Sequence, residues 1–330
     1  MFSKIIVCCP GNLVTGGPEL LHQFVHQLRL NYIDAEIIYY PFDRDFETPN
    51  AYKHYNVKVV SLSGIDKCDN NLVILPETGT KYYKYFKGCQ IGIWWLSVDN
   101  YFGYAKKDSG FINNLKNLIK IFLRRKISLN KMQMMLHFYQ SEYAREFLEK
   151  HHLQSIPLSD YLNVNHLINE GRKENVFREK IITYNPKKGI KTTALLKSRF
   201  PSFRFKALCD MTPREVREYL EKSMVYIDFG NHPGKDRFPR EAAMAGCVII
   251  TGRQGSAANN VDVPIPDMYK LDENSDCFIT DFEKLINSIF DDFETHTSIF
   301  REYREIISKE ESKFKQDVEL FIRKYISHYQ

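Results

Sequence analysis

The segment 224–252, MVYIDFGNHPGKDRFPREAAMAGCVIITG, limits the fold more than any other part of this chain. Its apolar runs at 224–229 and 247–251 are each typical of a buried strand. Between them stand a polar loop rich in Gly and Pro and a short helix, expected over residues 240–245 and ended by Gly246. A strand, a loop, a helix and a second strand in this order predict a parallel crossover unit.

The start of this helix is where a ligand is expected, because ligands of parallel sheets bind where the carboxyl ends of strands meet the helix starts. Four polar residues gather at that edge: Asp236, Arg237, Arg240 and Glu241. Basic side chains and free helix-start amides favour phosphates, and a carboxylate favours sugar hydroxyls. The pattern therefore indicates a ligand that carries both groups.

The stretch Glu241-Ala-Ala-Met-Ala-Gly246 resembles the donor site of GT-B glycosyltransferases, particularly those of the GT4 type. In those enzymes a Glu at this place binds the ribose of the nucleotide sugar, and the resemblance assigns that role to Glu241. Retaining members often carry a second Glu eight residues earlier, where this chain has Pro233. The retaining or inverting outcome therefore stays open. For this motif alone, the alternative is an ordinary crossover helix of another doubly wound protein.

The N-terminus gives a second motif. Residues 3–9 predict a first strand, and the loop after it ends in Gly16 and Gly17, before Pro18 opens a helix. The two glycines let the backbone approach a ligand, and free helix-start amides favour an anion. Gly-Pro stands where a Walker A motif has Lys-Ser/Thr. The loop resembles the Gly-Gly loop of GT-B N-terminal domains, which faces the donor's phosphates and sugar across the cleft.

A third motif has the order that the family requires. Residues 180–184 predict a strand, and the loop 185–189 leads to a helix. GT-B donor domains commonly open in this way, with a basic residue before Gly on the diphosphate. Lys188 matches best and Lys187 is the second choice; a solvated lysine pair in a turn is the alternative for this motif alone.

Together the three motifs predict an α/β chain with two Rossmann-like, doubly wound domains facing across a cleft. Residues 1–165 are expected to form the acceptor-side domain and 166–305 the nucleotide-sugar domain. Residues 306–330 are expected to form a helix that packs back toward the first domain. A length of 330 residues suits two such domains, and 43% hydrophobic with 26% charged residues is typical of a globular protein.

Other features limit where the protein works. The net charge of +5 does not by itself indicate a nucleic-acid partner, and none is expected. No apolar run reaches the roughly 18 to 20 residues of a membrane span, and no signal peptide is evident. Seven cysteines without a C-x-x-C pair indicate buried, reduced thiols. We expect a cytoplasmic protein, with peripheral attachment to the inner face of the membrane as an open alternative.

Beyond the motifs, the hydrophobic pattern predicts alternating strands and helices in the N-terminal half. Strands are expected at 3–9, 35–40, 57–61, 72–75, 90–96, 134–139 and 153–157. Helices are expected at 18–30, 78–87, 111–126 and 141–150.

Metal-site patterns are weak. Asp43 and Asp45 have the D-x-D spacing with which GT-A enzymes bind a metal, but the three motifs belong to a metal-independent fold. His22 and His26 lie four apart without the Glu of H-E-x-x-H. We therefore expect no metal and no cofactor besides the nucleotide diphosphate sugar as substrate.

Two features concern the acceptor. Trp94 and Trp95 end a predicted strand, and aromatic faces stack on sugar rings. Asp99 is the candidate catalytic base, and Trp95 and Glu77 are candidates for acceptor contacts. Two core tryptophans beside an incidental Asp are an equal alternative. The basic amphipathic stretch 111–126 suits an anionic membrane surface and a lipid-linked acceptor, or else a helix packed on the sheet with a solvated basic face.

The resemblance implies a metal-independent, hexosyltransferase-like enzyme that moves a sugar from a nucleotide diphosphate sugar to a hydroxyl. A glycan or lipid-linked acceptor in surface polysaccharide or glycoconjugate synthesis is expected. The phosphates would contact Lys188, and Arg237 or Arg240. A GT-B epimerase and a non-catalytic nucleotide- or sugar-binding subunit are the alternatives.

Overall fold

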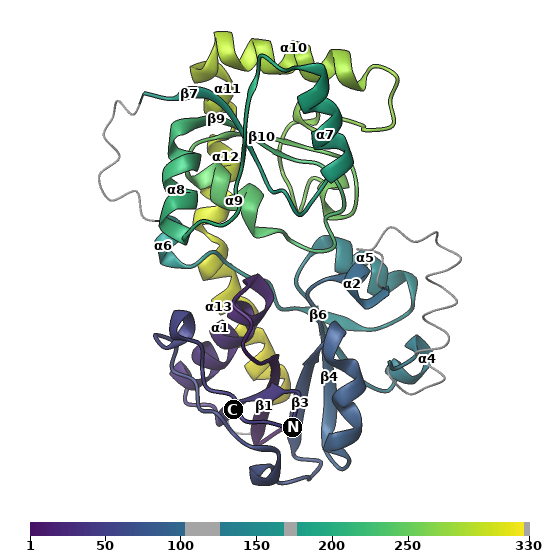
Figure 1. Ribbon diagram of the computed structural model, residues 1–330. Coiled ribbons are helices and arrows are strands. Elements are labelled where there is room, and N and C mark those ends of the chain that lie inside the picture. Colours follow the sequence, from purple (N-terminus) through teal and green to yellow (C-terminus); the bar gives the residue numbers. More distant parts are fainter. Residues whose placement is uncertain (103–125, 168–176, 327–330) are drawn as a thin grey trace. The chain divides into compact units, whose positions relative to one another are not determined.

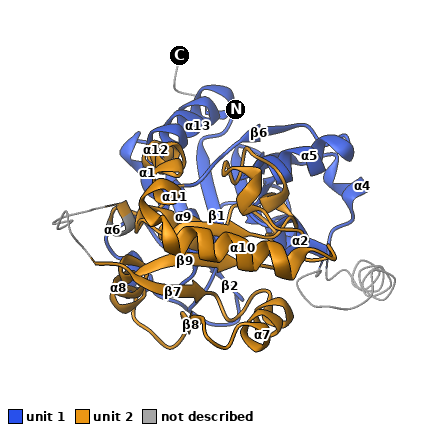
Figure 2. Ribbon diagram, turned by 90° about the horizontal axis from the view of Figure 1, so that it is seen from above, with its two compact units in different colours: residues 1–160, 312–330 blue, residues 161–311 orange. Residues whose placement is uncertain are grey.

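A computed structural model describes residues 1–102, 126–167 and 177–326 (Figure 1). The chain divides into two compact units, coloured separately in Figure 2. Unit 1 comprises Met1–Asp160 with Ser312–Gln330, and unit 2 comprises Tyr161–Glu311. Both units are α/β with parallel sheets, as the sequence predicts.

Unit 1 contains a six-stranded parallel sheet in the order β2-β1-β3-β4-β5-β6. Its strands are β1 (Lys4–Pro10), β2 (Ala35–Tyr40), β3 (Asn71–Pro76), β4 (Gln90–Trp95), β5 (Leu136–Tyr139) and β6 (Ser155–Pro157). Its helices are α1 (Gly16–Leu30), α2 (Val98–Phe102), α4 (Leu129–Met132) and α5 (Glu142–Lys150), with 3-10 segments η1 (Asn50–Tyr52), η2 (Leu62–Gly64) and η3 (Glu77–Phe86). Most strand residues are buried, as expected of a sheet that is covered on both faces.

The last helix, α13 (Glu310–Tyr325), begins in unit 2 and continues in unit 1. Phe321 of this helix packs edge-on against Phe24 of α1, with ring centroids 5.3 Å apart. It also packs against Phe138 of β5 at 5.4 Å. Phe321 is thereby part of the core of unit 1.

Unit 2 contains a four-stranded parallel sheet in the order β10-β9-β7-β8. Its strands are β7 (Glu179–Tyr184), β8 (Arg204–Ala207), β9 (Ser223–Asp228) and β10 (Val248–Thr251). Its helices are α6 (Val164–Leu167), α7 (Ile190–Arg199), α8 (Pro213–Lys222), α9 (Arg237–Met244), α10 (Phe278–Asp291), α11 (Phe293–Ile299) and α12 (Arg301–Ser308), with 3-10 segments η4 (Ser256–Ala258) and η5 (Asp267–Tyr269).

Each sheet has one point where the strand order reverses. In unit 1 the chain leaves β1 for β2 on one side, and β3 lies on the other side of β1. In unit 2 it leaves β7 for β8 on one side, and β9 lies on the other side of β7. Ligands of doubly wound sheets bind at such switch points, outside the carboxyl ends of the strands. The loops after β1 and β3, and those after β7 and β9, are therefore the places to look for a site.

Three expected elements differ in the structure. The strand expected at 57–61 is reduced to a single bridge between Ile37 and Val59. The helix expected at 78–87 is the 3-10 segment η3. The helix expected at 240–245 begins earlier, at Arg237, because Pro239 is tolerated in a first turn, where the backbone N–H has no helical partner.

Most of the basic helix expected at 111–126 lies outside the described residues, and so does its predicted membrane contact. Lys126, at its end, is described and buried: its ammonium lies 3.6 Å from the centre of the Tyr101 ring. This residue therefore does not belong to a solvated basic face. Among the described residues, no helix is both long enough and apolar enough to cross a membrane.

Candidate functional site

The two loops at the switch point of unit 2 touch through glycines. Gly189, before α7, has a left-handed φ of 52°, and a Cβ there would lie 2.1 Å from the carbonyl oxygen of Phe229. Gly230 has a φ of 106°, and its Cβ would lie 2.8 Å from the backbone nitrogen of Gly189. Only glycine fits such a close approach at positive φ. The glycines thereby bring Lys188 beside the loop that follows β9.

Lys188 and Asp236, both predicted donor residues, form an ion pair between these loops. Both side chains stay partly exposed, at 22% and 23%. Burial lowers the pKa of Lys188, but the carboxylates of Asp236 and Asp228 raise it further, so the ammonium stays charged. Burial raises the pKa of Asp236, whereas Lys188 and His232 lower it more, to about 2. The ion pair thus places one cation and one anion, both partly exposed, between the loops at the switch point.

The first turns of α9 carry the predicted ribose and phosphate residues. Asp236 is the N-cap residue, and Arg237 is the first residue of the helix. The guanidinium Nε of Arg237 donates to Glu241 Oε1 at 3.2 Å, one turn further on. Two loop-and-helix segments therefore meet at the switch point. One contributes Lys188, before α7, and the other contributes Arg237 and Glu241, in α9.

The Arg240 side chain is buried and does not face the predicted ligand site. It is 1% exposed, and its Nη1 donates to Glu310 Oε2 at 2.7 Å. It also donates to the carbonyl oxygens of Asp236 and Lys235, at 3.2 Å each. A guanidinium enclosed in this way has no face for a ligand, so the predicted contact of Arg240 with phosphate is corrected: Arg240 holds the loop from within.

The switch point of unit 1 lies between the glycine loop and Glu77. Gly16 and Gly17 are the first residues of α1, and a Cβ on Gly17 would meet only Leu96, at an ordinary 3.7 Å. The backbone N–H of Leu96 donates to Glu77 Oε2 at 3.0 Å. Burial raises the pKa of Glu77 to about 7, although backbone amides donate to the carboxylate. A carboxyl group that titrates near neutrality is suited to proton transfer.

The two tryptophans are core residues. Trp94 and Trp95 are 0% exposed, and their indole N–H groups donate to the carbonyl of Leu158 at 2.9 Å and to His137 Nδ1 at 3.1 Å. Protein atoms cover both rings, so the prediction that Trp95 stacks on an acceptor is wrong in this structure. Asp99 lies in α2, is buried, and accepts from the Tyr143 hydroxyl at 3.0 Å.

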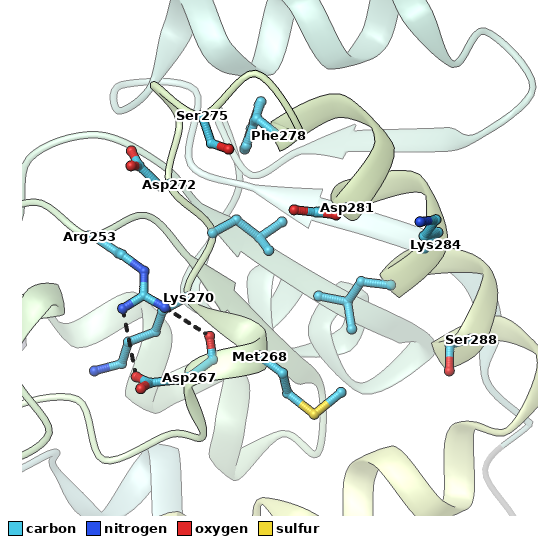
Figure 3. Close-up of a pocket in the computed structure, with 12 residues that line it drawn as sticks. Arg253, Asp267, Met268, Lys270, Asp272, Ser275, Phe278, Asp281, Lys284 and Ser288 are labelled. Carbon is cyan, nitrogen blue, oxygen red and sulfur yellow. Dashed lines mark hydrogen bonds and ion pairs between the residues drawn. The ribbon is translucent and has the colours of Figure 1, made fainter.

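Each unit has a cavity of a size suited to a small ligand. The cavity of unit 1 has about 540 Å³ and is lined by Glu77, Thr78, Thr80, Lys81, Asn100, Tyr101 and Lys126. One cavity of unit 2, shown in Figure 3, has about 550 Å³ and lies between η5, the segment after it and α10. Arg253 and Asp267 face each other there at 3.7 Å. None of the predicted donor residues lines this second cavity.

One residue of the site was not predicted from the sequence. His232 is completely buried, and its Nδ1 lies 2.8 Å from Asp236 Oδ2. A signal was present, because Asp228, His232 and Asp236 follow one another at intervals of four residues. The backbone of this stretch is a loop, however, so helical spacing gave no reason to bring them together.

The sequence matches no protein-family model and no curated protein. The structure is similar to sucrose-phosphate synthase from Thermosynechococcus elongatus (9% identity, 98% of each chain, TM-score 0.68). It is also similar to Anabaena HepE in complex with UDP-glucose (10% identity, 97% of this chain and 99% of that one, TM-score 0.63). A third similar structure is T4 phage BGT in complex with UDP and Mn²⁺ (11% identity, 98% and 100%, TM-score 0.53). These proteins are GT-B glycosyltransferases, and the chain described here has the GT-B fold.

Proposed function

We propose that this protein transfers a sugar from a nucleotide diphosphate sugar to a hydroxyl group of an acceptor. The observation that carries the proposal is the switch point of unit 2, where Lys188, Arg237 and Glu241 come from the two loop-and-helix segments that meet in the fold. The similar structures of HepE and BGT are complexes with UDP-glucose and UDP, which supports a nucleotide ligand of this class.

The donor would be held by its phosphates and its ribose. Lys188, Arg237 and the positive N-terminal end of the α9 dipole supply positive charge for the diphosphate, and Glu241 accepts from the ribose hydroxyls. The same charges stabilise the diphosphate as it leaves, because the negative charge on its oxygens grows in the transition state. Gly16 and Gly17, at the switch point of unit 1, remain candidates for donor binding.

The acceptor would be the hydroxyl of a glycan or of a lipid-linked sugar, in surface polysaccharide or glycoconjugate synthesis. Glu77 is the stronger candidate for the base, because burial brings its pKa to about 7 and it lines a cavity. Asp99 is the second candidate. The same proposal includes a cytoplasmic location. It also includes attachment to an anionic membrane through residues 111–126, except for the buried Lys126.

A donor panel separates this function from its alternatives. The protein is incubated with UDP-, ADP- and GDP-sugars, with and without mixed glycan acceptors, and both the free nucleotide and the donor sugar are analysed. A transferase releases nucleoside diphosphate faster when its acceptor is present. An epimerase changes the donor sugar without acceptor-dependent release, and a binding subunit does neither, so either result overturns the proposal.

Turnover is expected to persist in excess EDTA, because Lys188, Arg237 and helix-start amides supply the charge that a divalent ion supplies in other transferases. The BGT complex contains Mn²⁺, so the similar structures do not decide this point. The rate of nucleotide release is compared before and after chelation. Loss of activity that Mn²⁺ restores would contradict the expectation and bring back Asp43 and Asp45 as a candidate metal site.

A further inference from the structure

The His232 ring lies between a backbone carbonyl oxygen and a carboxylate. Its Nε2 lies 3.2 Å from the backbone carbonyl oxygen of Asp228, and its Nδ1 lies 2.8 Å from the Asp236 carboxylate. Among the described residues Nδ1 forms no hydrogen bond, so its contact with Asp236 is an ion pair, which requires the protonated ring. A buried imidazole this close to a carboxylate therefore favours the imidazolium form.

The surroundings of His232 favour that charge. The carboxylate of Asp228, at the end of β9, approaches Nε2 to 3.7 Å, and Asp236 caps α9 on the other side. Lys188, from the loop after β7, is the cation of the group, and the Tyr226 hydroxyl donates to Asp228 at 3.0 Å. Burial lowers the pKa of His232, but the two carboxylates outweigh burial and Lys188, so the net shift is upward.

The imidazole is also held in place. The carbonyl oxygen of His232 accepts from the N–H of Ser256 at 2.8 Å. Gly255 has a φ of 62°, and a Cβ there would lie 2.1 Å from that same oxygen. The backbone is fixed on one side, Nε2 is hydrogen-bonded to the Asp228 carbonyl on the other, and the ring is fully buried, so it is held in place. A change in its protonation therefore acts on Asp236 and Lys188.

Resting on the proposed function, we propose that His232 is a positioning residue whose proton promotes binding of the nucleoside diphosphate. The imidazolium shares the charge of Asp236, so the ammonium of Lys188 is available to the phosphates. Without that proton, the carboxylate is balanced by Lys188 alone, and the cluster of Asp228, His232, Asp236 and Lys188 loses one positive charge. A diphosphate then meets a less positive site.

The direction of the pH effect follows from the sign of the shift. A raised pKa means that the imidazolium is present at lower pH and is lost as the pH rises through that pKa. Affinity for a diphosphate should therefore fall with rising pH, by about tenfold for one unit charge lost several ångströms from the ligand. Binding at a pH near this pKa should take up protons, because the bound anion stabilises the imidazolium.

The test is calorimetric titration of the wild-type protein with UDP, ADP and GDP between pH 7.0 and 9.5. That range begins above the second ionisation of the phosphate, about 6. Each pH is run in two buffers with different ionisation enthalpies, which measures proton uptake directly. His232→Asn keeps a polar side chain but no titratable charge, so this variant should bind the diphosphate weakly, with no pH dependence and no proton uptake. The matched control is His296→Asn. His296 lies in unit 2, its ring is hydrogen-bonded with the hydroxyls of Tyr269 and Ser288, and the variant should bind as wild type does.

The outcomes separate this inference from the proposed function. A diphosphate that binds wild type with the same affinity and no proton uptake across the range overturns the role of His232 and leaves the function standing. A His232→Asn variant that keeps the wild-type pH dependence overturns it as well. If none of the diphosphates binds at any pH, the proposed function fails and the inference fails with it. The wild-type data alone decide the question if the variant does not fold.

Discussion

Replacing Arg240 with methionine is expected to lower the free energy of unfolding by about 3 kcal/mol, at the lower end of the range for a broken buried ion pair. The guanidinium and its partner carboxylate, Glu310, are 1% and 3% exposed. Methionine fills the volume but leaves that carboxylate buried with less compensation. Lys235, whose ammonium lies 2.7 Å from Glu310 Oε1, remains and limits the loss. Equilibrium unfolding in urea measures the change.

Two further variants show whether the loss of stability comes from the buried ion pair. Arg214 pairs with Glu218 on an exposed helix face, so Arg214→Met should cost less than about 1 kcal/mol. The double variant with Glu310→Gln should recover part of the loss, because the buried carboxylate is removed together with the guanidinium that compensated it. The Lys235 ammonium then loses its ion pair with Glu310, which limits the recovery. If Arg240→Met costs no more than Arg214→Met, the buried pair does not stabilise the loop, and Arg240 returns as a candidate for phosphate binding.

Replacing Glu241 with alanine is expected to weaken binding of a nucleoside diphosphate by about 1 to 3 kcal/mol, or about 5- to 150-fold in Kd, which is the range for a lost charged hydrogen bond. Folding should survive, because the carboxylate forms its ion pair with the partly exposed Arg237 at the start of a helix. Calorimetry with the tightest-binding nucleotide measures the effect.

Two further variants show whether the lost affinity comes from the charge of Glu241 or from its hydrogen-bond acceptor. Glu241→Gln keeps an acceptor for ribose hydroxyls but removes the charge, so it should bind between wild type and Glu241→Ala. Glu218→Ala removes a carboxylate from an exposed pair on α8 and should leave Kd unchanged. Equal affinity of Glu241→Ala and wild type would show that the ribose contacts some other group, and the assignment would have to be abandoned.

The sequence predicts those parts of the fold that are determined by a few neighbouring residues or by the order of strands and helices. Thr212, Pro213 and Glu215 predict the start of α8, and the structure shows the complete capping box there. Strand-loop-helix order also places Lys188 and Asp236 at the same sheet edge, because parallel strands end at a common edge. These are patterns within a few residues, or consequences of topology.

The errors have long-range causes. Arg240 was expected in the ligand site because its partner, Glu310, lies seventy positions further along the chain. Trp95 was expected to face a ligand because it ends a strand, but β4 is an inner strand, covered on both faces, so neither tryptophan reaches solvent. His232 was missed because its role depends on a loop conformation that is fixed from outside by Gly255 and Ser256.

The central claim is that a nucleotide diphosphate sugar binds at the switch point of unit 2, and a structure of the protein with a bound nucleoside diphosphate tests it most directly. The account predicts phosphate oxygens within hydrogen-bond distance of Lys188 Nζ and of amides at the start of α9, with ribose hydroxyls on the Glu241 carboxylate. A nucleotide found instead in the cavity between η5 and α10, or one bound without contact to Lys188 and Glu241, would contradict it.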